Sequence, residues 1–243
     1  MRVRSTPPSA RRAPHAGPVV VAIDGPAASG KSSTAQWVAE RVGFRHIDSG
    51  ALYRAATALA LRRGGAPESW TEADVLQAAG GIRLRSEGTS LVPVWCDAPL
   101  EEEMRSGAVT LHVSRVAQMP GVRAWVNALV RAAAAGRNVV VDGRDIGTAV
   151  FPNASVKIFL VADPWERARR RLIQRLGRRP TDVEIAAETE RLVQRDARDA
   201  TQTTQARDAI LIDTTYLTQA EQVDRIVALV EALTRRGDET SSD

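Results

Sequence analysis

The stretch VVVAIDGPAASGKSS at residues 19–33 constrains this chain more than any other part of its sequence. It opens with a short apolar run, rich in β-branched side chains, that ends at Asp24, and this pattern predicts a buried strand. From Gly25 to Ser32 the spacing is G-x-x-x-x-G-K-S, and a helical pattern follows. A strand, a glycine-rich turn and a helix in this order indicate a phosphate-binding loop, or P-loop.

The residue types of this loop suit a nucleoside triphosphate. Glycines let backbone N–H groups approach phosphate oxygens closely, and the following helix turns its positive dipole end toward the anion. Lys31 would reach the β- and γ-phosphates, and the Ser32 hydroxyl would be a ligand of Mg²⁺. Lys31 and Lys157 are the only lysines among 33 basic residues, which argues against chance at this position. The residues expected to bind ATP are Gly25, Pro26, Ala27, Ala28, Ser29, Gly30, Lys31, Ser32 and Ser33.

Length and charge limit the classes of protein to which the chain can belong. Its 243 residues, 44% of them apolar, can bury a sizeable core. No apolar run approaches the ~20 residues that a membrane span needs. The formal charge of +4 comes from four arginines in residues 1–17, since the rest has 29 basic and 29 acidic residues. We therefore expect no membrane association, and no nucleic-acid binding by the folded part.

The chain ends, the cysteine and the histidines give further expectations. Residues 1–17 lack the apolar centre of a secretory signal and are expected to form a disordered basic tail, and residues 235–243 a polar tail. The single cysteine, Cys96, follows Trp95 in an apolar run, so we expect it to be buried, in a protein of the cytoplasm. The histidines (His15, His46 and His112) show no metal-ligand spacing, and we expect chemistry without a histidine cluster.

Five short expected strands, most of them apolar, alternate with helical patterns along the chain. The expected strands are 19–23, 44–47, 138–141, 156–161 and 210–213, and the expected helices are 33–41, 51–63, 122–135, 164–176, 181–200 and 218–234. Such alternation predicts an α/β fold, with a five-stranded parallel sheet that has helices on both faces. Residues 18–65 and 122–234 would form this core.

Residues 66–121 interrupt the alternation and are expected to form a small α+β insertion on the substrate side. Thr71 is a good N-cap for a helix to Ala79, and residues 100–119 are mostly helical. Between them, residues 81–86 and 90–96 alternate like two strands of a small antiparallel sheet.

Polar residues follow the second and third expected strands, at the edge where open α/β sheets bind ligands. Asp48-Ser49-Gly50 precedes Arg54, and Asp142-Gly143-Arg144-Asp145 ends the third strand. If the acceptor is itself a phosphate, its attacking oxygen is already ionised, so the site needs cations and alignment more than a general base. Arg54 and Arg144 suit this role, although Arg54 taken alone is equally compatible with a solvated helix position.

A basic helix follows the fourth strand. Arg167, Arg171 and Arg175 form one stripe at helical spacing, and Glu166 is the only acid within the expected helix. Because pairing with Glu166 cannot satisfy these arginines, we expect a short helical lid at about 165–180, with Arg167 and Arg171 acting on the transferred phosphate.

Four sequence blocks, in this order and at these separations, resemble the bacterial cytidylate kinases: GPAASGKSS, DSGALYR, GRDIGTAVFPNASVKIFL and RDARD. The second and third blocks are specific for the family, and the resemblance covers about 19–234. It implies a P-loop kinase core, an insertion that binds the nucleoside monophosphate, a short lid, and Mg²⁺-dependent transfer of the ATP γ-phosphate to CMP or dCMP in pyrimidine metabolism. We also expect a monomer.

The resemblance assigns roles to individual residues. Ser49, Arg195 and Asp199 resemble the sugar contacts of the family. Arg54 and Arg144 resemble its contacts to the acceptor phosphate, and Ser114, Arg123 and Asp145 its cytosine readers. By pattern alone, Arg195 and Asp199 would be a surface ion pair with Arg191, and Ser114 and Arg123 would be ordinary helix-surface residues.

The cytosine readers agree with the chemistry of the base. Cytosine presents an amine donor beside two acceptors, so a carboxylate with a guanidinium distinguishes it from uracil. The chain departs from the family at Gln202, where an arginine is common three residues after the RDARD block. An amide can donate a hydrogen bond but carries no charge; Arg207 is a candidate substitute.

Two other functions stay open at this point. A P-loop kinase could use another acceptor, namely UMP, AMP or a non-nucleotide. A regulatory or RNA-associated P-loop protein would use the basic arm to bind nucleic acid in a salt-dependent way. The zero net charge of the folded part argues against the second.

Overall fold

The structure is a computed structural model that describes residues 17–239, except for the side chains of residues 235–239. The expected basic tail therefore lies outside the described residues, apart from Gly17. The polar tail was expected from residue 235, but the last helix continues to Glu239, and residues 240–243 lie outside the description.

One eight-stranded sheet runs through the described chain in the order β3-β4-β2-β6-β1-β7-β8, with the short β5 paired to β4. Five of its strands are parallel neighbours, which confirms the expected core: β2 (Arg45–Asp48), β6 (Val139–Asp142), β1 (Val20–Asp24), β7 (Val156–Val161) and β8 (Ile210–Asp213). β1 lies in the middle, with Val21 opposite Val140 on one side and Val156 on the other.

The insertion does not form a sheet of its own, and that expectation was wrong. β3 (Ile82–Glu87) and β4 (Ser90–Trp95) do form an antiparallel pair. However, β4 also pairs in parallel with β2, with His46 opposite Ser90, so the pair continues the central sheet. The alternation of apolar and polar residues in the sequence predicts that β3 and β4 pair with each other. It does not show that β4 also pairs with β2, which lies far away in the sequence.

Cys96 is exposed, so the expectation that it belongs to the core was also wrong. It forms a two-residue turn with Asp97 between β4 and β5 (Ala98–Pro99), where Trp95 pairs with Ala98. Both turn residues have positive φ, 50° and 60°. The turn therefore ends the apolar run at Trp95, and the cysteine side chain faces solvent.

The helices begin and end close to the expected residues. They are α1 (Lys31–Val42), α2 (Ser49–Arg63), α3 (Glu72–Ala79), α4 (Glu101–Met104), α5 (Gly107–Val116), α6 (Pro120–Ala134), α7 (Pro164–Leu176), α8 (Asp182–Asp199) and α9 (Gln219–Glu239). Thr71 caps α3 in a complete capping box, as predicted. The helical stretch at 100–119 is divided at Ser106, which caps α5. No helix within residues 17–239 is long and apolar enough to cross a bilayer.

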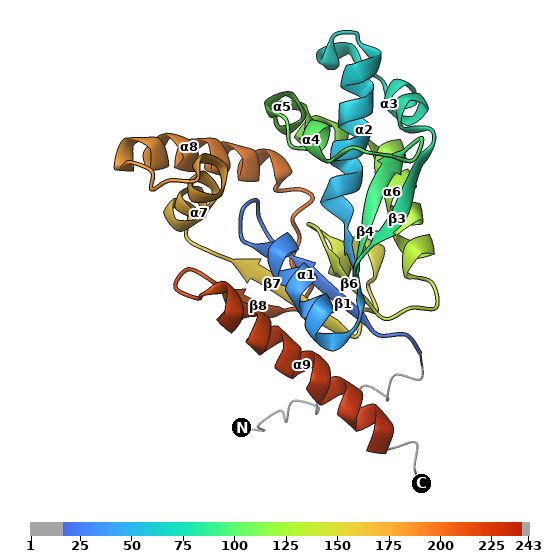
Figure 1. Cartoon of the computed structure of the whole chain (residues 1–243), viewed down its shortest axis with the longest axis vertical. Helices are drawn as coiled ribbons and strands as arrows, with labels where there is room; N and C mark the ends of the chain where they lie inside the picture. Colours follow the sequence, from blue (N-terminus) through green and yellow to red (C-terminus); the bar gives the residue numbers. More distant parts are fainter. Residues whose placement is uncertain (1–16, 240–243) are drawn as a thin grey trace, which may run out of the picture.

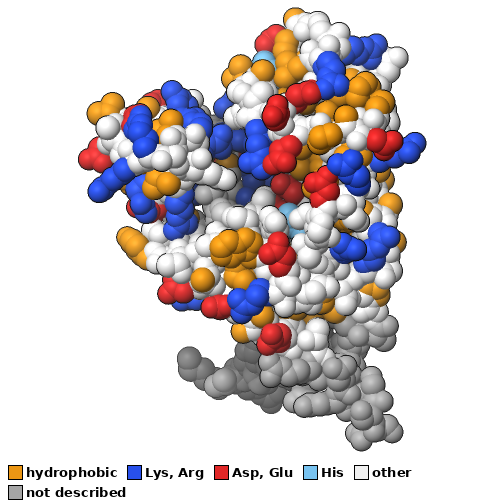
Figure 2. Space-filling view, viewed as in Figure 1, with side chains coloured by type: hydrophobic (Ala, Val, Ile, Leu, Met, Phe, Trp, Pro, Cys, Tyr) orange, Lys and Arg blue, Asp and Glu red, His pale blue; other side chains and the backbone are white. Residues whose placement is uncertain are grey.

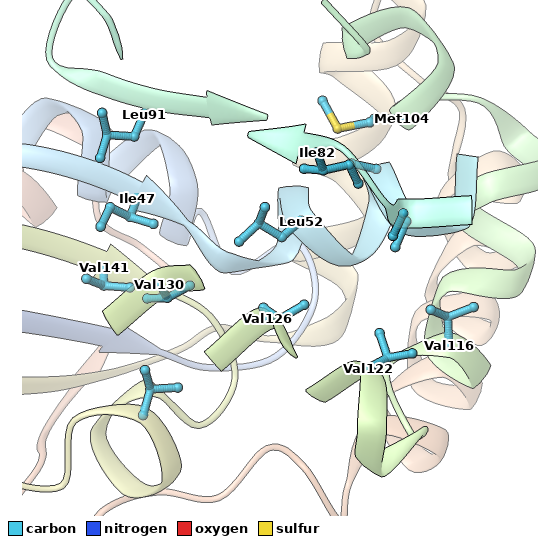
Figure 3. Close-up of a cluster of buried hydrophobic side chains, with 14 of the residues drawn as sticks. Ile47, Leu52, Ile82, Leu91, Met104, Val116, Val122, Val126, Val130 and Val141 are labelled. Carbon is cyan, nitrogen blue, oxygen red and sulfur yellow. The ribbon is translucent and has the colours of Figure 1, made fainter. Parts of the chain in front are cut away.

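Helices cover both faces of the sheet, as the alternation predicted (Figure 1). Successive strand residues face opposite sides, so Ile47 and Val141 pack with α2 and α6, whereas Val140 and Ile158 pack with α1 and α9. Figure 3 shows the first of these two cores. It extends without a break into the insertion through Ile82 and Met104.

Two parts of the molecule rise above the carboxyl ends of the parallel strands. One is the pair α7 and α8, and the other is α2 together with the helices of the insertion (Figure 1). Figure 2 shows a hollow between them where basic side chains gather. The two parts meet where the Gln118 amide donates to the Arg198 carbonyl oxygen, 2.9 Å away.

The turn at Cys96 and Asp97 gives a prediction about stability. Replacing them by Asn and Gly should raise the free energy of unfolding by about 1 kcal/mol, because Asn-Gly adopts positive φ at both positions with less strain. Urea unfolding followed by circular dichroism measures the change. Cys96→Ser keeps the strain and should stay within about 0.5 kcal/mol of the wild type. An unchanged or lower value for the double variant would contradict the prediction.

Candidate functional site

Two glycines of the P-loop occupy backbone positions that do not suit a larger residue. Gly25 follows β1 with φ of 146°, and a Cβ there would lie 2.1 Å from the Leu160 carbonyl oxygen of β7. Gly30 has φ of 89° and directly precedes α1. Gly25 therefore allows close packing of the backbone against β7, and Gly30 allows the left-handed turn that begins α1. The free N–H groups of the first turn of α1 consequently lie at the loop.

Side chains from three other segments hold this loop. Arg144, after β6, donates to the Gly25 carbonyl oxygen at 3.1 Å. Arg167 of α7 donates to the Ala27 carbonyl oxygen at 2.9 Å, and the Ala27 N–H donates to Asp196 of α8 at 3.3 Å. The loop is thus tied to the β6 end and to the α7–α8 pair.

Lys31 lies buried within the loop. Its Nζ donates to the Pro26 carbonyl oxygen at 2.6 Å and to Ser29 Oγ at 3.4 Å. Burial lowers the pKa of Lys31 to about 7, and the positive charge of Arg144 adds to the effect. The nearby acids raise the pKa but do not compensate.

Those acids are three aspartates at the carboxyl ends of adjacent strands, namely Asp24 (β1), Asp142 (β6) and Asp48 (β2). Asp24 is buried and accepts the backbone N–H groups of Ile146 and Gly147, each at 2.8 Å. Burial still raises the pKa of Asp24 to about 6. Burial and the charge of Asp142 also raise the pKa of Asp48. The sequence pattern predicted no role for these aspartates; their position at the ends of strands beside the P-loop was the available signal.

His46 also belongs to this site, although the sequence predicted no role for a histidine. Its ring contacts Asp142 Oδ1 at 2.8 Å, and the Ser32 hydroxyl donates to the other carboxylate oxygen of Asp142 at 2.6 Å. Burial opposes the charged form of His46, but the hydrogen bond and charge of Asp142 outweigh it and raise the pKa above its usual value.

Arginines from α2, α7, α8 and the loop after β6 lie near one another at this site. Burial lowers the pKa of Arg54, and the charges of Arg171 and Arg144 lower it further. Burial, with Arg144 and Arg54, lowers the pKa of Arg195 to about 10. The guanidinium groups therefore lie close enough to repel one another; they belong to Arg54, Arg144, Arg171 and Arg195. The acids that offset the charges of Arg54 and Arg195 are Asp48 and Asp199. Such an excess of buried positive charge is suited to a phosphate group.

The pair Arg195 and Asp199 forms, with 3.6 Å between Nε and Oδ2, but it is not a surface pair with Arg191. Both residues are largely buried, and Arg191 pairs with Glu188 instead. Arg195 Nε is buried without a hydrogen-bond partner, alone among side-chain polar atoms of the described residues. The helical pattern gave the spacing correctly but could not show which face of α8 is covered.

Glu166 is not the only acid available to the α7 arginines, so that expectation was wrong: α8 supplies others. Arg167 pairs with Asp196 at 2.7 Å. The buried Glu188 contacts Arg171 at 3.0 Å and Arg175 at 3.7 Å. Arg167 is buried, with protein partners for its guanidinium, whereas Arg171 remains partly exposed at the hollow.

Arg123 and Asp145 lie together, as the cytosine-reader assignment requires. They form a direct ion pair, and Arg123 also donates to the Ala117 carbonyl oxygen at the end of α5. Burial raises the pKa of Asp145, against the effect of Arg123. Ser114 is buried one turn earlier on α5, so it is not a surface residue. Tyr53, which the sequence did not single out, lies near the pair; burial raises its pKa to about 12.

Three further residues from the sequence analysis are Ser49, Gln202 and Arg207. The Ser49 hydroxyl donates to the Asp142 carbonyl oxygen at 2.8 Å, and a Cβ at Gly143 would collide with it at 2.5 Å. Gln202 is partly buried, and its backbone N–H donates to the Asp199 carbonyl oxygen at 3.0 Å. Arg207 is exposed.

Within residues 17–239, no group of three or more His, Cys, Asp or Glu side chains is arranged to hold a metal ion by itself. The pair Ser32 and Asp142 nevertheless offers oxygen ligands beside the P-loop. This fits Mg²⁺ bound with a nucleotide, because that ion takes one or two protein oxygens and completes its shell with phosphates and water.

Comparison with known proteins gives one consistent family. The sequence model described as cytidylate kinase matches residues 21–232. The cytidylate kinase of Salinibacter ruber is 41% identical over 227 residues, which cover 90% of this chain and all of the relative. That of Geobacillus sp. (strain WCH70) is 43% identical over 213 residues, 86% of this chain and 95% of the relative.

A bifunctional pantoate ligase/cytidylate kinase of Synechococcus sp. (strain JA-3-3Ab) is 40% identical over 241 residues. The match covers 96% of this chain but 44% of the relative. The chain therefore spans less than half the length of this bifunctional relative.

The low pKa of Lys31 predicts proton uptake on binding of a nucleoside triphosphate. Lys31 is mostly neutral at pH 8 in the free protein, and a bound phosphate favours its charged form. Binding at pH 8 should therefore take up close to one proton, and the uptake should fall toward zero below pH 7. Calorimetry in two buffers of different ionisation enthalpy measures it. Binding at pH 8 without proton uptake would show that Lys31 is already charged.

Proposed function

The chain belongs to the cytidylate kinase family, and we propose that it transfers the γ-phosphate of ATP to CMP or dCMP. The observation that carries this proposal is that two groups of residues meet at the carboxyl ends of the parallel strands. The first is the P-loop with Lys31. The second is the arginine cluster (Arg54, Arg144, Arg171 and Arg195) with the Arg123–Asp145 pair, and Arg144 joins it to the P-loop by donating to the Gly25 carbonyl oxygen.

The arginine cluster suits an acceptor that is already anionic. A CMP phosphate oxygen needs no general base, and its approach to the triphosphate is opposed by charge repulsion. Arg54, Arg144 and Arg195 would bind the acceptor and offset that repulsion, and Lys31 would hold the β- and γ-phosphates. Catalysis then consists of alignment and charge stabilisation in a site that excludes water.

The ion pair beside the cluster suits the base. The Asp145 carboxylate would accept a hydrogen bond from the cytosine amine, and Arg123 would donate to the adjacent acceptors. The neutral hydroxyl of Ser114 lies on the helix that Arg123 contacts. Uracil presents a carbonyl where cytosine has the amine, and this carbonyl would meet the carboxylate.

The proposal includes Mg²⁺ as the cofactor, held through Ser32 with Asp142 beside it. When bound, this ion neutralises charge on the donor phosphates. In the same proposal, residues 66–121 bind the monophosphate, and residues 165–180, which include most of α7, form the lid, with Arg171 the arginine that remains available to the substrate. Arg167 has its partners within the protein and would hold the P-loop. We further propose a monomer in the cytoplasm without nucleic-acid binding.

The acceptor preference tests this function. A coupled assay of ADP formation measures phosphate transfer from ATP to each acceptor. The kcat/KM should be highest for CMP or dCMP and lower for UMP and AMP. Asp145→Ala should raise the KM for CMP by roughly 10- to 100-fold and erode the preference over UMP, because the cytosine amine loses its acceptor. Asp224→Ala, an exposed aspartate on α9, serves as the matched control.

Three outcomes would count against the assignment. A wild-type chain that prefers UMP would refute the acceptor, and an unchanged preference in Asp145→Ala would refute the base reader. Salt-dependent binding of RNA without transfer would favour the regulatory alternative.

Lys31→Ala should separate the two halves of the site. We expect transfer to fall by about 100- to 1,000-fold, because one cation that stabilises the developing charge is lost. The affinity for CMP should change little, since Lys31 lies on the P-loop side. Single-turnover transfer and equilibrium CMP binding check the two parts. A comparable loss of CMP affinity would place Lys31 in the acceptor half instead.

A further inference from the structure

A continuous chain of hydrogen bonds crosses the sheet below the P-loop. The Ser32 hydroxyl donates to Asp142 Oδ2 at 2.6 Å, and His46 Nε2 lies 2.8 Å from Asp142 Oδ1. On the other side of the imidazole, Nδ1 and the Ser90 hydroxyl share a hydrogen bond of 3.0 Å. The four residues come from α1, β6, β2 and β4.

Strand register places these side chains on one face of the sheet. His46 pairs with Val140 of β6, and Asp142 lies two residues beyond Val140, so it points the same way as His46. His46 also pairs directly with Ser90 of β4. The chain of contacts therefore depends on the attachment of β4 to β2, and through Ser90 it reaches the insertion.

Asp142 needs both of its hydrogen-bond partners. Its side chain is almost fully buried, and two other aspartates lie close enough to affect the same groups. A buried carboxylate oxygen without a donor carries a large cost in free energy. His46 supplies the donor for one oxygen, so it fixes the rotation of the carboxylate and leaves the other oxygen directed at Ser32.

The orientation of Asp142 affects the binding of the donor phosphates through the Ser32 hydroxyl. A hydroxyl whose proton is donated to Asp142 turns its lone pairs elsewhere, which is the arrangement a metal ligand needs. Ser32 is exposed at the loop, whereas His46 is buried behind it. His46 thus lies too far back to touch a substrate, and any effect it has must pass through Asp142.

We propose that His46 is a positioning residue for the metal–nucleotide half of the site: it holds Asp142 so that Ser32 presents its oxygen to Mg²⁺, with Ser90 fixing the ring. The role rests on the proposed ATP-dependent function, but it concerns the binding of Mg·ATP and not the identity of the acceptor.

Two polar substitutions of similar character form the test. In His46→Gln the side-chain amide extends far enough to donate to Asp142, as Nε2 does, whereas the shorter amide in His46→Asn reaches toward Ser90 only. Calorimetry without CMP measures the Kd of ATP once with saturating Mg²⁺ and once with EDTA. His46→Asn should weaken Mg·ATP binding about 10-fold and leave metal-free ATP binding unchanged, and His46→Gln should stay near the wild type.

Steady-state kinetics supply a second measurement. His46→Asn should raise the KM for Mg·ATP and the Mg²⁺ concentration for half-maximal rate, with the KM for CMP unchanged. Ser90→Ala should cause a smaller change of the same sign. His112→Leu, a histidine on α5 that packs on Trp70 away from this chain of contacts, is the matched control and should behave as wild type.

The outcomes separate this proposal from its premise. Mg·ATP binding by His46→Asn equal to that of the wild type would overturn it, as would equal weakening with and without Mg²⁺, which indicates a general disturbance of the P-loop. If His46→Asn does not fold, Ser90→Ala and His46→Gln carry the test, and a wild-type ratio of metal-bound to metal-free affinity in Ser90→Ala would overturn the fixing role of that serine. A wild type that binds Mg·ATP but does not phosphorylate CMP would refute the proposed function alone.

Discussion

The site depends on the parallel pairing of β1 with strands on both sides. Because β6 and β7 run in the same direction as β1, the three strands end at one edge, and the loops that leave them meet there. Gly25 leaves β1 so close to β7 that a Cβ would collide with the Leu160 carbonyl oxygen. The P-loop therefore rests on a neighbouring strand, and sheet register fixes its position relative to Asp142 and Arg144.

The candidate site combines a lysine with a lowered pKa and a group of arginines. Lys31 lies near three aspartates, and burial still lowers its pKa to about 7. Arg54 and Arg195 lie near two further arginines, and the acids that offset them are Asp199 and Asp48, the second of which also acts on Lys31. Lys31 can gain a proton when a phosphate binds, whereas the arginines are positive beforehand. Two anionic groups can thus approach each other between prearranged cations, which lowers the electrostatic cost of bringing them together.

Much of the core could be predicted from the sequence, because most of the parallel strands are short, mainly apolar runs bounded by polar or turn residues. All five parallel strands were placed within a residue or two, and Thr71 was identified as a cap from local chemistry. The failures concern contacts between distant segments. His46 and Asp142 are 96 residues apart, and only the pairing of β2 with β6 joins them. The exposure of Cys96 results from a turn that its apolar neighbours concealed, and Ser114 and Arg123 were assigned through family resemblance alone.

The arginines show why a count of charges in the sequence cannot define a binding site. Arg167 and Arg171 lie on the same stripe of α7 and looked equivalent in the sequence. In the structure, Arg167 is buried between Asp196 and the Ala27 carbonyl oxygen, so its hydrogen-bonding capacity is used within the protein. Arg171 shares Glu188 with two other arginines, and one carboxylate cannot neutralise three guanidiniums. Which arginine stays available to an anion therefore depends on the acids that the neighbouring helix supplies. By this criterion Arg171 is the better candidate for the proposed site, whereas Arg167 holds the P-loop.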